Sequence, residues 1–319
     1  MKSATIKAYA KINLGLRIIG RRDDGYHELR TVYQSVSLAD TVKVSIIPSR
    51  VRSRVSLECA GLPVPAGRDN LVVRAAELLC DELGLKLQIR IHLTKTIPTG
   101  GGLGGGSSDA AAVIRAIHLL TGQRMKWATQ LHVAAQLGSD VPYFLIGGRA
   151  LGVGRGEEVY ALADGPPRHC VIALPDESMS TAEAYRLLAA KPLHGQSVPL
   201  GTPRKKLTRP AMHPTIESFC AALCAETMDS SATGGGHAPN DFEPLLFSRF
   251  PKLTQAKRSL LRAGAEWAAL TGSGSAVYGL FKEMAQARQA GHQLEKSGMR
   301  LYLSRTVGRQ RYNRAVQAD

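Results

Sequence analysis

The sequence contains few cysteines, and their spacing excludes the common zinc sites and disulfide frameworks. None of the five forms a CxxC pair or joins histidines at zinc-ligand spacing. They are Cys59, Cys80, Cys170, Cys220 and Cys224. The last two are spaced to share one face of a helix, where two small buried side chains are the simpler interpretation. We therefore expect neither a metal-ligand cluster nor a disulfide.

Long apolar runs are also missing. No segment approaches the roughly 20 apolar residues that cross a bilayer as a helix. Residues 1–16 lack the continuous apolar stretch and small-residue cleavage site of a secretory signal. The content of hydrophobic residues, 44%, and of aromatic residues, 5%, suits a globular protein, and 319 residues allow two domains. We expect a cytoplasmic protein without a membrane partner.

Acidic residues are scarce compared with basic ones. The chain has 26 Asp and Glu against 41 Lys and Arg, a formal net charge of +15. A basic surface can bind nucleic acid, and it can also attract a polyanionic nucleotide and a diphosphate substrate. The basic residues are scattered, with clusters at 204–209 and 300–314, and no aromatic-interleaved RNA signature accompanies them. A solvated basic surface explains most of these residues, so we expect no nucleic-acid partner. The sequence does not indicate an oligomeric state.

Glycine, by contrast, is concentrated in one segment. Residues 98–109 read PTGGGLGGGSSD, with six glycines and two serines. Apolar and polar residues alternate at 87–93, which predicts a half-buried strand, and the Ala-rich residues 110–120 predict a helix with Ser107, Ser108 and Asp109 as its N-cap and first turn. The free N–H groups and positive dipole end of such a helix attract anions, and glycine lets the backbone approach them closely. The segment is therefore predicted to bind phosphate.

Two familiar phosphate loops do not match this segment. A Walker loop requires a lysine immediately before the hydroxyl residue, whereas Ser107 follows Gly106. A dinucleotide-binding loop requires a short βαβ unit with an acidic residue about twenty positions on, which is not apparent. A flexible glycine linker remains the structural alternative, but amphipathic elements flank the loop closely on both sides.

Periodicity predicts mixed helix and strand along the whole chain. Residues 1–60 are typical of antiparallel sheet, and the DGPPR sequence near residue 165 is typical of a linker. Residues 191–214 are expected to form a long loop, and 230–237 a second flexible segment. Further helices are expected at 71–83, 126–137, 181–190, 252–263 and 283–297. Further strands are expected at 169–175 and 300–306, and residues 270–281 are expected to form a glycine-serine turn followed by an apolar strand.

Three segments together resemble the GHMP kinase superfamily. They are AKINLGL at 10–16, PTGGGLGGGSSD at 98–109 and LTGSGSAVYGLF at 270–281. Their order and spacing match the three motifs of that superfamily. The resemblance implies an α+β fold of two domains, an N-terminal ATP-binding domain over 1–163 and a C-terminal domain over 164–319, with the active site in the cleft between them.

Other segments narrow the resemblance to one branch of the superfamily. They are DGYHEL at 24–29, TVYQ at 31–34, DNLVVRAAELL at 69–79, GSDVPYFLIGG at 138–148 and NDFE at 240–243. This branch phosphorylates a cytidine diphosphate ester of methylerythritol, in the non-mevalonate route to isoprenoids. The resemblance covers nearly the whole chain and is weakest at 191–214. Tyr9 departs from the branch, where proline is more frequent before the Ala-Lys pair.

The resemblance assigns two catalytic residues. Asp140 would accept the proton of the acceptor hydroxyl, and Lys11 would stabilise the alkoxide and the transferred phosphoryl group. Considered alone, an Asp after Gly-Ser more often caps a helix or turn, and a lysine in a strand more often faces water. The surrounding GSDVPYF sequence, and the apolar neighbours of Lys11, favour the catalytic interpretation.

The resemblance also implies binding residues for ATP and for the acceptor, with Mg²⁺ as the metal that accompanies ATP. No carboxylate pair is dedicated to this metal, so the nucleotide phosphates are expected to supply most of its ligands. The expected ATP-binding residues are Asn70, Leu71, Lys95, Pro98, Thr99, Gly100, Gly101, Gly102, Leu103, Gly104, Gly105, Gly106, Ser107 and Ser108. The expected acceptor-binding residues are Asn13, Tyr26, His27, Tyr33 and Tyr185, of which the tyrosines would stack on cytosine. For residues 271–275 two interpretations stay open, a role beside the phosphates and a simple turn before a strand.

Overall fold

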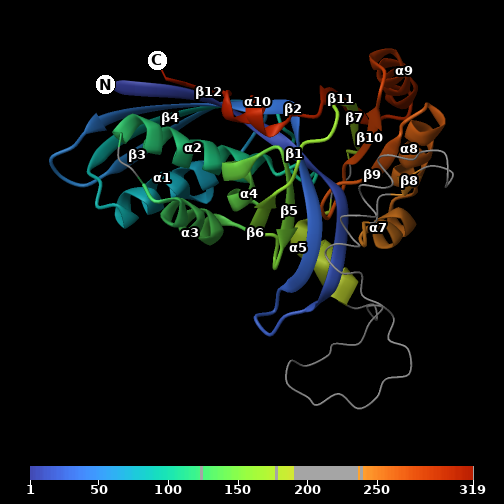
Figure 1. Cartoon of the computed structure of the whole chain (residues 1–319), viewed down its shortest axis with the longest axis horizontal. Helices are drawn as coiled ribbons and strands as arrows, with labels where there is room; N and C mark the ends of the chain where they lie inside the picture. Colours follow the sequence, from blue (N-terminus) through green and yellow to red (C-terminus); the bar gives the residue numbers. More distant parts are fainter. Residues whose placement is uncertain (123–124, 177–178, 190–235, 238–239, 319) are drawn as a thin grey trace.

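The computed structural model describes residues 1–122, 125–176, 179–189, 236–237 and 240–318 (Figure 1). The predicted loop at 191–214, most of the flexible segment at 230–237, and Cys220 and Cys224 lie outside the described residues. Across the described ranges, no helix has both the length and the apolar character required to cross a membrane.

A seven-stranded sheet forms the N-terminal half. Its strands β1 (Lys2–Arg21) and β2 (His27–Pro48) make one long hairpin. Strand β4 (Leu87–Lys95) joins β2, β3 (Arg54–Gly61) forms the edge, and β12 (Val316–Ala318) pairs with the other side of β1. The first part of β2, Thr31–Gln34, also pairs with β5 (Arg149–Val153), which is followed by β6 (Glu158–Ala161). The sheet is antiparallel except for the β3–β4 pair.

Helices cover one face of this sheet (Figure 1). They are α1 (Leu71–Glu82), α2 (Gly105–Thr121), α3 (Trp127–Leu137) and α4 (Val141–Ile146), with the 3-10 turn Gly67–Asp69 before α1. The alternation predicted for β4 is present, because Leu87, Ile89, Ile91 and Leu93 are buried and the residues between them are exposed. The buried side chains form one core with α1 and α2.

The beginning of α2 differs from the prediction. The helix begins at Gly105 with Gly104 as its N-cap, rather than around Ser107 to Asp109. Glycine lowers intrinsic helix stability by about 1 kcal/mol compared with alanine. A side chain at Gly105, however, would place its Cβ 2.8 Å from the Lys95 Nζ atom. The contact with Lys95 therefore favours glycine in the first turn of α2. Helix propensity calculated from the sequence alone cannot predict this, because the contact exists only in the folded protein.

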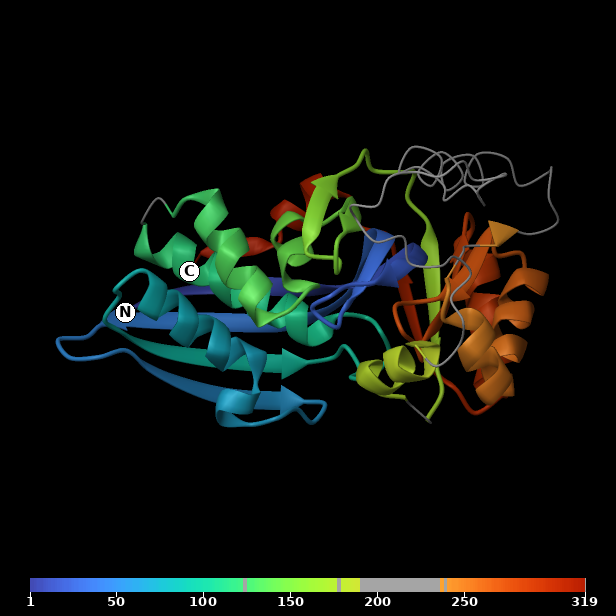
Figure 2. The same cartoon turned by 90° about the horizontal axis from the view of Figure 1, so that it is seen from below.

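A second, five-stranded sheet forms the other half of the molecule. Its strand order is β11 (Arg300–Arg305), β7 (His169–Leu174), β10 (Val277–Phe281), β9 (Trp267–Leu270) and β8 (Gly236–His237). Helices α7 (Glu243–Arg249), α8 (Pro251–Arg262) and α9 (Met284–Glu295) lie together on this side of the molecule (Figure 1). Helix α5 (Thr181–Ala189) lies between the two halves, in yellow-green in Figure 2.

The two halves of the molecule share a hydrophobic core, and the chain passes between them twice. Ile12 and Leu14 of β1 pack in one buried cluster with Ile172 and Tyr278 of the second sheet. The Tyr278 hydroxyl donates to the carbonyl oxygen of Asn13 at 2.8 Å. This core holds the middle of β1, where the sequence predicts functional residues, between the two sheets.

After β11 the chain returns to the first sheet through α10 (Arg309–Asn313) and β12. Tyr312 of α10 is buried, its ring lies 5.6 Å from the ring of Tyr9, and its hydroxyl donates to the carbonyl oxygen of Phe144 at 2.7 Å. Phe144 belongs to α4, the helix that follows Asp140. The return segment therefore supports the element on which the predicted base depends.

Candidate active site

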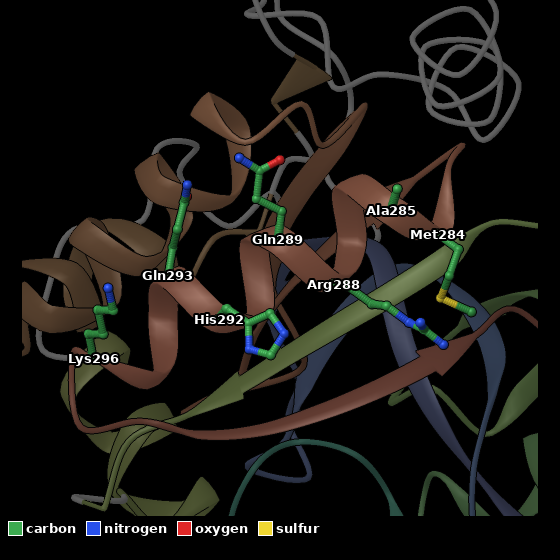
Figure 3. Close-up of a pocket in the computed structure, with 7 residues that line it drawn as sticks. All are labelled: Met284, Ala285, Arg288, Gln289, His292, Gln293 and Lys296. Atoms are coloured by element: carbon green, nitrogen blue, oxygen red, sulfur yellow. The ribbon is translucent and has the colours of Figure 1, made fainter.

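A cleft of about 820 Å³ brings together nearly all of the residues that the sequence predicts to be functional. A second hollow, about 610 Å³, lies on α9 and is lined by Met284, Arg288, His292, Lys296 and their helix neighbours (Figure 3). All of its lining side chains come from one helix face, and it contains no carboxylate or glycine loop. The cleft is the better candidate because several elements of both halves converge on it.

The glycine loop forms one wall of the cleft and is fixed through its carbonyl oxygens. The carbonyl of Leu103 accepts from the N–H of Lys11 at 3.0 Å, and that of Gly100 accepts from Ser275 at 3.2 Å. The carbonyl of Gly102 accepts from the Thr271 hydroxyl at 3.2 Å. Since these bonds use carbonyl groups, the N–H groups of the loop and of the first turn of α2 are the polar backbone groups offered to the cleft.

Two glycines of the loop are required by its geometry. Gly102 and Gly104 have φ angles of +72° and +70°. A Cβ atom on Gly102 would lie 2.2 Å from the carbonyl oxygen of Thr271, and one on Gly104 would lie 2.7 Å from the ring of Phe144. Residues 271–275 thus do more than turn before β10, because they bond the loop and also line the cleft through Gly272 and Ser273.

Lys11 and Asp140 meet on the floor of the cleft. The Lys11 Nζ atom lies 3.4 Å from Asp140 Oδ2 and donates to Asn13 Oδ1 at 2.7 Å. The Lys11 side chain is only 4% exposed, whereas that of Asp140 is 32% exposed. Asp140 occupies the N-cap of α4 but makes no side-chain capping bond, so the helix does not use its carboxylate.

Tyr33 holds the second oxygen of Asp140. Its hydroxyl donates to Asp140 Oδ1 at 3.0 Å, and its ring stacks on Tyr143 with centroids 4.6 Å apart. Burial, reinforced by the Asp140 charge, raises the pKa of Tyr33 well above its ordinary value. Tyr33 therefore remains a neutral donor at neutral pH, and Asp140 is oriented from both sides while part of it faces the cleft.

Aromatic side chains line another part of the cleft. The rings of His27 and Tyr185 lie 5.1 Å apart, and Tyr185 meets the buried ring of Phe242 edge-on at 4.9 Å. Tyr26 is 55% exposed, and the guanidinium group of Arg155 lies 4.7 Å from its ring centroid. These side chains offer a flat apolar surface beside one cationic group.

His27 carries a buried polar atom without a hydrogen bond. Its Nε2 atom has no partner among the described residues, although the side chain lines the cleft. Burial, together with the charge of Arg21, lowers the pKa of His27, so the ring is neutral at pH 7. A buried ring nitrogen without a partner costs free energy, and a ligand that supplies one would recover it.

Three predicted ATP-binding residues have other partners in the structure. Asn70 caps α1 by accepting from the Val72 N–H at 3.1 Å, and Ser108 donates to the Tyr9 carbonyl oxygen at 2.7 Å. Neither residue lines the cleft. Lys95 does line it, but its ammonium group bonds two buried carboxylates. The other predicted site residues all line the cleft, Leu71 at the start of α1 included.

Sequence reasoning missed several residues that line the cleft. Arg155 lies between β5 and β6, and no motif known from the sequence draws attention to it. Thr31 is the first residue of the TVYQ segment, and its hydroxyl accepts from Asn13 Nδ2 at 2.7 Å, so its place in that segment was an available signal. Ser139, Thr181 and Ser273 also line the cleft. The Ser273 hydroxyl donates to the Thr181 hydroxyl at 3.0 Å, a pairing of residues 92 positions apart that only the fold reveals.

Comparison with known proteins gives consistent results. The chain matches the family model of the GHMP kinases N terminal domain over residues 70–148 and that of the GHMP kinases C terminal over 216–299. It is 44% identical over 282 residues to the 4-diphosphocytidyl-2-C-methyl-D-erythritol kinase of Solibacter usitatus (strain Ellin6076), covering 88% of this chain and 82% of the relative. It is 38% identical to the protein of that name from Moorella thermoacetica (strain ATCC 39073 / JCM 9320), covering 96% and 100%.

Solved structures extend the comparison to the fold. A crystal structure of 4-(cytidine 5'-diphospho)-2C-methyl-D-erythritol kinase superposes with a TM-score of 0.72 at 33% identity, covering 95% of this chain and 99% of that one. A homoserine kinase from Cytophaga hutchinsonii ATCC 33406 superposes with a TM-score of 0.69 at 20% identity, covering 99% and 97%. The second likeness concerns the fold alone. The α+β fold expected from the sequence is confirmed.

Proposed function

From the membership of this chain in the GHMP kinases, and within them in the 4-diphosphocytidyl-2-C-methyl-D-erythritol kinases, we propose its reaction. The protein transfers the γ-phosphoryl group of ATP to the 2-hydroxyl group of 4-diphosphocytidyl-2-C-methyl-D-erythritol. This reaction belongs to the non-mevalonate route to isoprenoid precursors. The observation that carries the proposal is the pairing of Lys11 with Asp140 beside a glycine loop that lines the same cleft.

Asp140 is the proposed general base. It accepts the proton of the acceptor hydroxyl while that oxygen forms its bond to the γ-phosphorus, and the bond from phosphorus to the bridging oxygen of ADP breaks. Tyr33 donates to one carboxylate oxygen and leaves the other to receive the proton. Lys11, within 3.4 Å of the carboxylate, supplies positive charge where the phosphoryl oxygens gather negative charge.

The glycine loop is the proposed ATP site, with the phosphates bound by N–H groups between Gly100 and Ser107. Asp140 is the one carboxylate among the described residues that line the cleft. A single carboxylate fits a magnesium ion held mainly by phosphate oxygens and water, which is the usual arrangement when Mg²⁺ accompanies ATP. When bound, the ion would neutralise charge that develops on the phosphates.

The aromatic part of the cleft is the proposed acceptor site. Cytosine has a π face for Tyr26 and Tyr185, and a hydrogen-bonding edge for the unpartnered Nε2 atom of His27. Lys95 is bonded to the buried side chains of Asp40 and Asp109, and Lys11 faces Asp140. Arg155 also pairs with a carboxylate, through its Nε atom to Glu157 at 3.0 Å, but it is the most exposed of these three cations and lies beside the Tyr26 ring. We therefore propose that Arg155 meets the diphosphate of the acceptor.

We further propose the domain division at 163/164. It falls between β6, which ends at Ala161 in the first sheet, and β7, which begins at His169 in the second. Residues 309–318 belong to the second domain in sequence but pack on the first sheet. The proposed domains are therefore connected twice, and a cleft between them cannot open freely on either side.

The reaction is tested by measuring ADP release from purified protein with Mg-ATP and four acceptors in turn. These are 4-diphosphocytidyl-2-C-methyl-D-erythritol, mevalonate, homoserine and galactose. We expect turnover with the cytidine compound alone. Turnover with another alcohol would retain the ATP site but contradict the roles of Tyr26 and His27. If no acceptor supported turnover, the proposed function would be wrong.

Replacing Tyr26 with alanine is expected to raise the KM for the acceptor without changing the KM for ATP. Stacking on one aromatic ring contributes about 1 to 3 kcal/mol, which corresponds to roughly a 5- to 150-fold rise. Tyr26 is exposed, so its removal leaves no cavity in a core. Tyr160→Ala, another exposed tyrosine outside the cleft lining, is the matched control. An unchanged acceptor KM for Tyr26→Ala would exclude the stacking role.

A further inference from the structure

Three buried charged side chains lie behind the glycine loop. Lys95, the last residue of β4, places its Nζ atom 2.5 Å from Asp40 Oδ2 and 2.7 Å from Asp109 Oδ2. All three side chains are at most 3% exposed. They come from three elements, since Asp40 belongs to β2 and Asp109 to the beginning of α2. We call these residues the Lys95 cluster.

The cluster holds the chain on both sides of the glycine loop. Asp40 Oδ1 accepts from the N–H groups of Thr96 and Ile97 at 2.5 and 2.8 Å, immediately before the loop begins. Asp109 lies in the second turn of α2, immediately after it. A Cβ atom on Gly105 would lie only 2.8 Å from the Lys95 Nζ atom. The position of the loop therefore depends on the cluster.

The two carboxyl groups of the cluster have unequal environments. Asp40 accepts three hydrogen bonds, one from Lys95 and two from the backbone. Asp109 accepts one, from Lys95, and its Oδ1 atom is buried without a partner among the described residues. Two carboxylates around one ammonium group would leave a buried net negative charge, which is costly in a protein interior.

We propose that Asp40 and Asp109 are positioning residues of the ATP site, and that Asp109 carries a proton when ATP binds, so that the Lys95 cluster is electrically neutral. The inference rests on the proposed function, because it assumes that the glycine loop binds ATP. It goes beyond that function in making ATP binding sensitive to one proton outside the cleft. Asp109 does not line the cleft and acts through Lys95 and the loop.

Other groups around Asp109 agree with this assignment. Burial raises its pKa to about 8, Lys95 opposes the rise, and the Asp40 charge adds to it. From β3, Cys59 couples electrostatically to both Asp109 and Lys95, and burial raises the pKa of that thiol. The proton lost first on raising the pH is therefore that of Asp109.

Losing this proton should weaken ATP binding. Above pH 8 a buried negative charge appears directly behind a loop that binds phosphate. At an effective dielectric constant near 20, one such charge about 10 Å from a phosphate charge changes affinity by roughly tenfold. The phosphates of Mg-ATP are already fully ionised at pH 7.5, because the bound metal lowers their last pKa, and Asp109→Asn controls for other groups of the protein that titrate between pH 7.5 and 9.5.

The test is isothermal calorimetry of Mg-ATP binding between pH 7.5 and 9.5, with wild type and Asp109→Asn. We expect the wild-type Kd to rise about tenfold across this range. The variant, which has a neutral group of the same shape, should bind as wild type does at pH 7.5 and remain nearly constant. Asp40→Asn should weaken ATP binding at least tenfold at every pH, because an amide cannot accept from Lys95 and two backbone N–H groups together.

Two further measurements separate the possible failures. Asp164→Asn is the matched control, since Asp164 also accepts from two backbone N–H groups, at 3.1 and 2.7 Å, but lies outside the cleft lining. It should leave ATP binding unchanged. Equal pH dependence in wild type and Asp109→Asn would overturn the inference while keeping the ATP site. No ATP binding by wild type at any pH would instead overturn the proposed function.

Thermal unfolding without ATP tests the proton assignment independently. A folded-state pKa near 8, above the unfolded value of about 3.9, means that folding takes up a proton between these values. Stability from this group is therefore lost as pH rises from about 4 to 8, and no more is lost above 8. We therefore expect the Tm of wild type to fall relative to the Tm of Asp109→Asn as the pH rises from 5 to 8. Above pH 8 the difference between the two Tm values should stay constant. A constant difference throughout would mean that Asp109 is ionised, contrary to the inference.

Discussion

Replacing Asp140 with asparagine is expected to lower kcat by about 10²- to 10⁴-fold, the usual contribution of a general base. Asparagine has the same shape and can still accept the Tyr33 hydroxyl bond, so the cleft keeps its geometry. It cannot accept the proton of the acceptor hydroxyl. Single-turnover rates measured with saturating Mg-ATP and the cytidine acceptor check the result, and calorimetry should give an ATP Kd close to that of wild type.

The comparison for Asp140→Asn is Asp176→Asn. Asp176 is an exposed aspartate paired with Arg300 and lies outside the cleft lining. An exposed ion pair contributes about 0 to 1 kcal/mol, so this variant should turn over normally. Near-normal turnover by Asp140→Asn as well would remove Asp140 from the role of base.

Replacing Gly104 with valine is expected to abolish detectable ATP binding. The backbone φ of +70° is unfavourable for a β-branched residue and costs on the order of 1 to 3 kcal/mol. The new Cβ atom would also lie 2.7 Å from the Phe144 ring and 3.2 Å from Lys11 Cγ. The loop must then move away from α4, and its N–H groups no longer converge on the phosphates. Calorimetric titration with Mg-ATP measures the loss.

Gly122→Val is the matched control for Gly104→Val. Gly122 has a φ of +66°, and a Cβ atom there would meet nothing within 4 Å. This variant has the same backbone strain without the collision, so it should lose stability but still bind ATP. Circular dichroism on both proteins shows whether each is folded. Normal ATP binding by a folded Gly104→Val protein would contradict the phosphate site.

Local patterning was sufficient to predict most elements of the fold. The alternation at 87–93 and the apolar periodicity at 71–83 predicted β4 and α1, because each buries one face against the other. The length of β1 and β2 could not be predicted. The sequence predicted antiparallel sheet over residues 1–60 without bounds for its strands, and bulges after Tyr9, Asn13 and Ile18 let one long hairpin continue through irregular pairing. Strand β12 was missed because residues 316–318 pair with residues nearly the whole chain away.

The site was predictable where its residues lie in contiguous segments. Lys11 and Asp140 were assigned from the motifs around them, and they lie together in the structure, although their roles remain proposals. The Lys95 cluster could not be found in this way, since its members come from β2, β4 and α2 and each is unremarkable in its own segment. Arg155 was missed because its importance arises from its position over Tyr26. Residues brought together only by tertiary structure leave no local pattern.

The contact between Tyr312 and Phe144 has a consequence for how the protein is made. The hydroxyl of Tyr312 holds the carbonyl of Phe144 across 168 positions of the chain, and the Tyr312 ring lies where a side chain on Gly147 would be. A nascent chain that has already exposed the glycine loop and Asp140 therefore lacks this support of α4 until Tyr312 has also left the ribosome. Chains that end before Tyr312 should hold α4, and with it Asp140, less firmly than the full chain does.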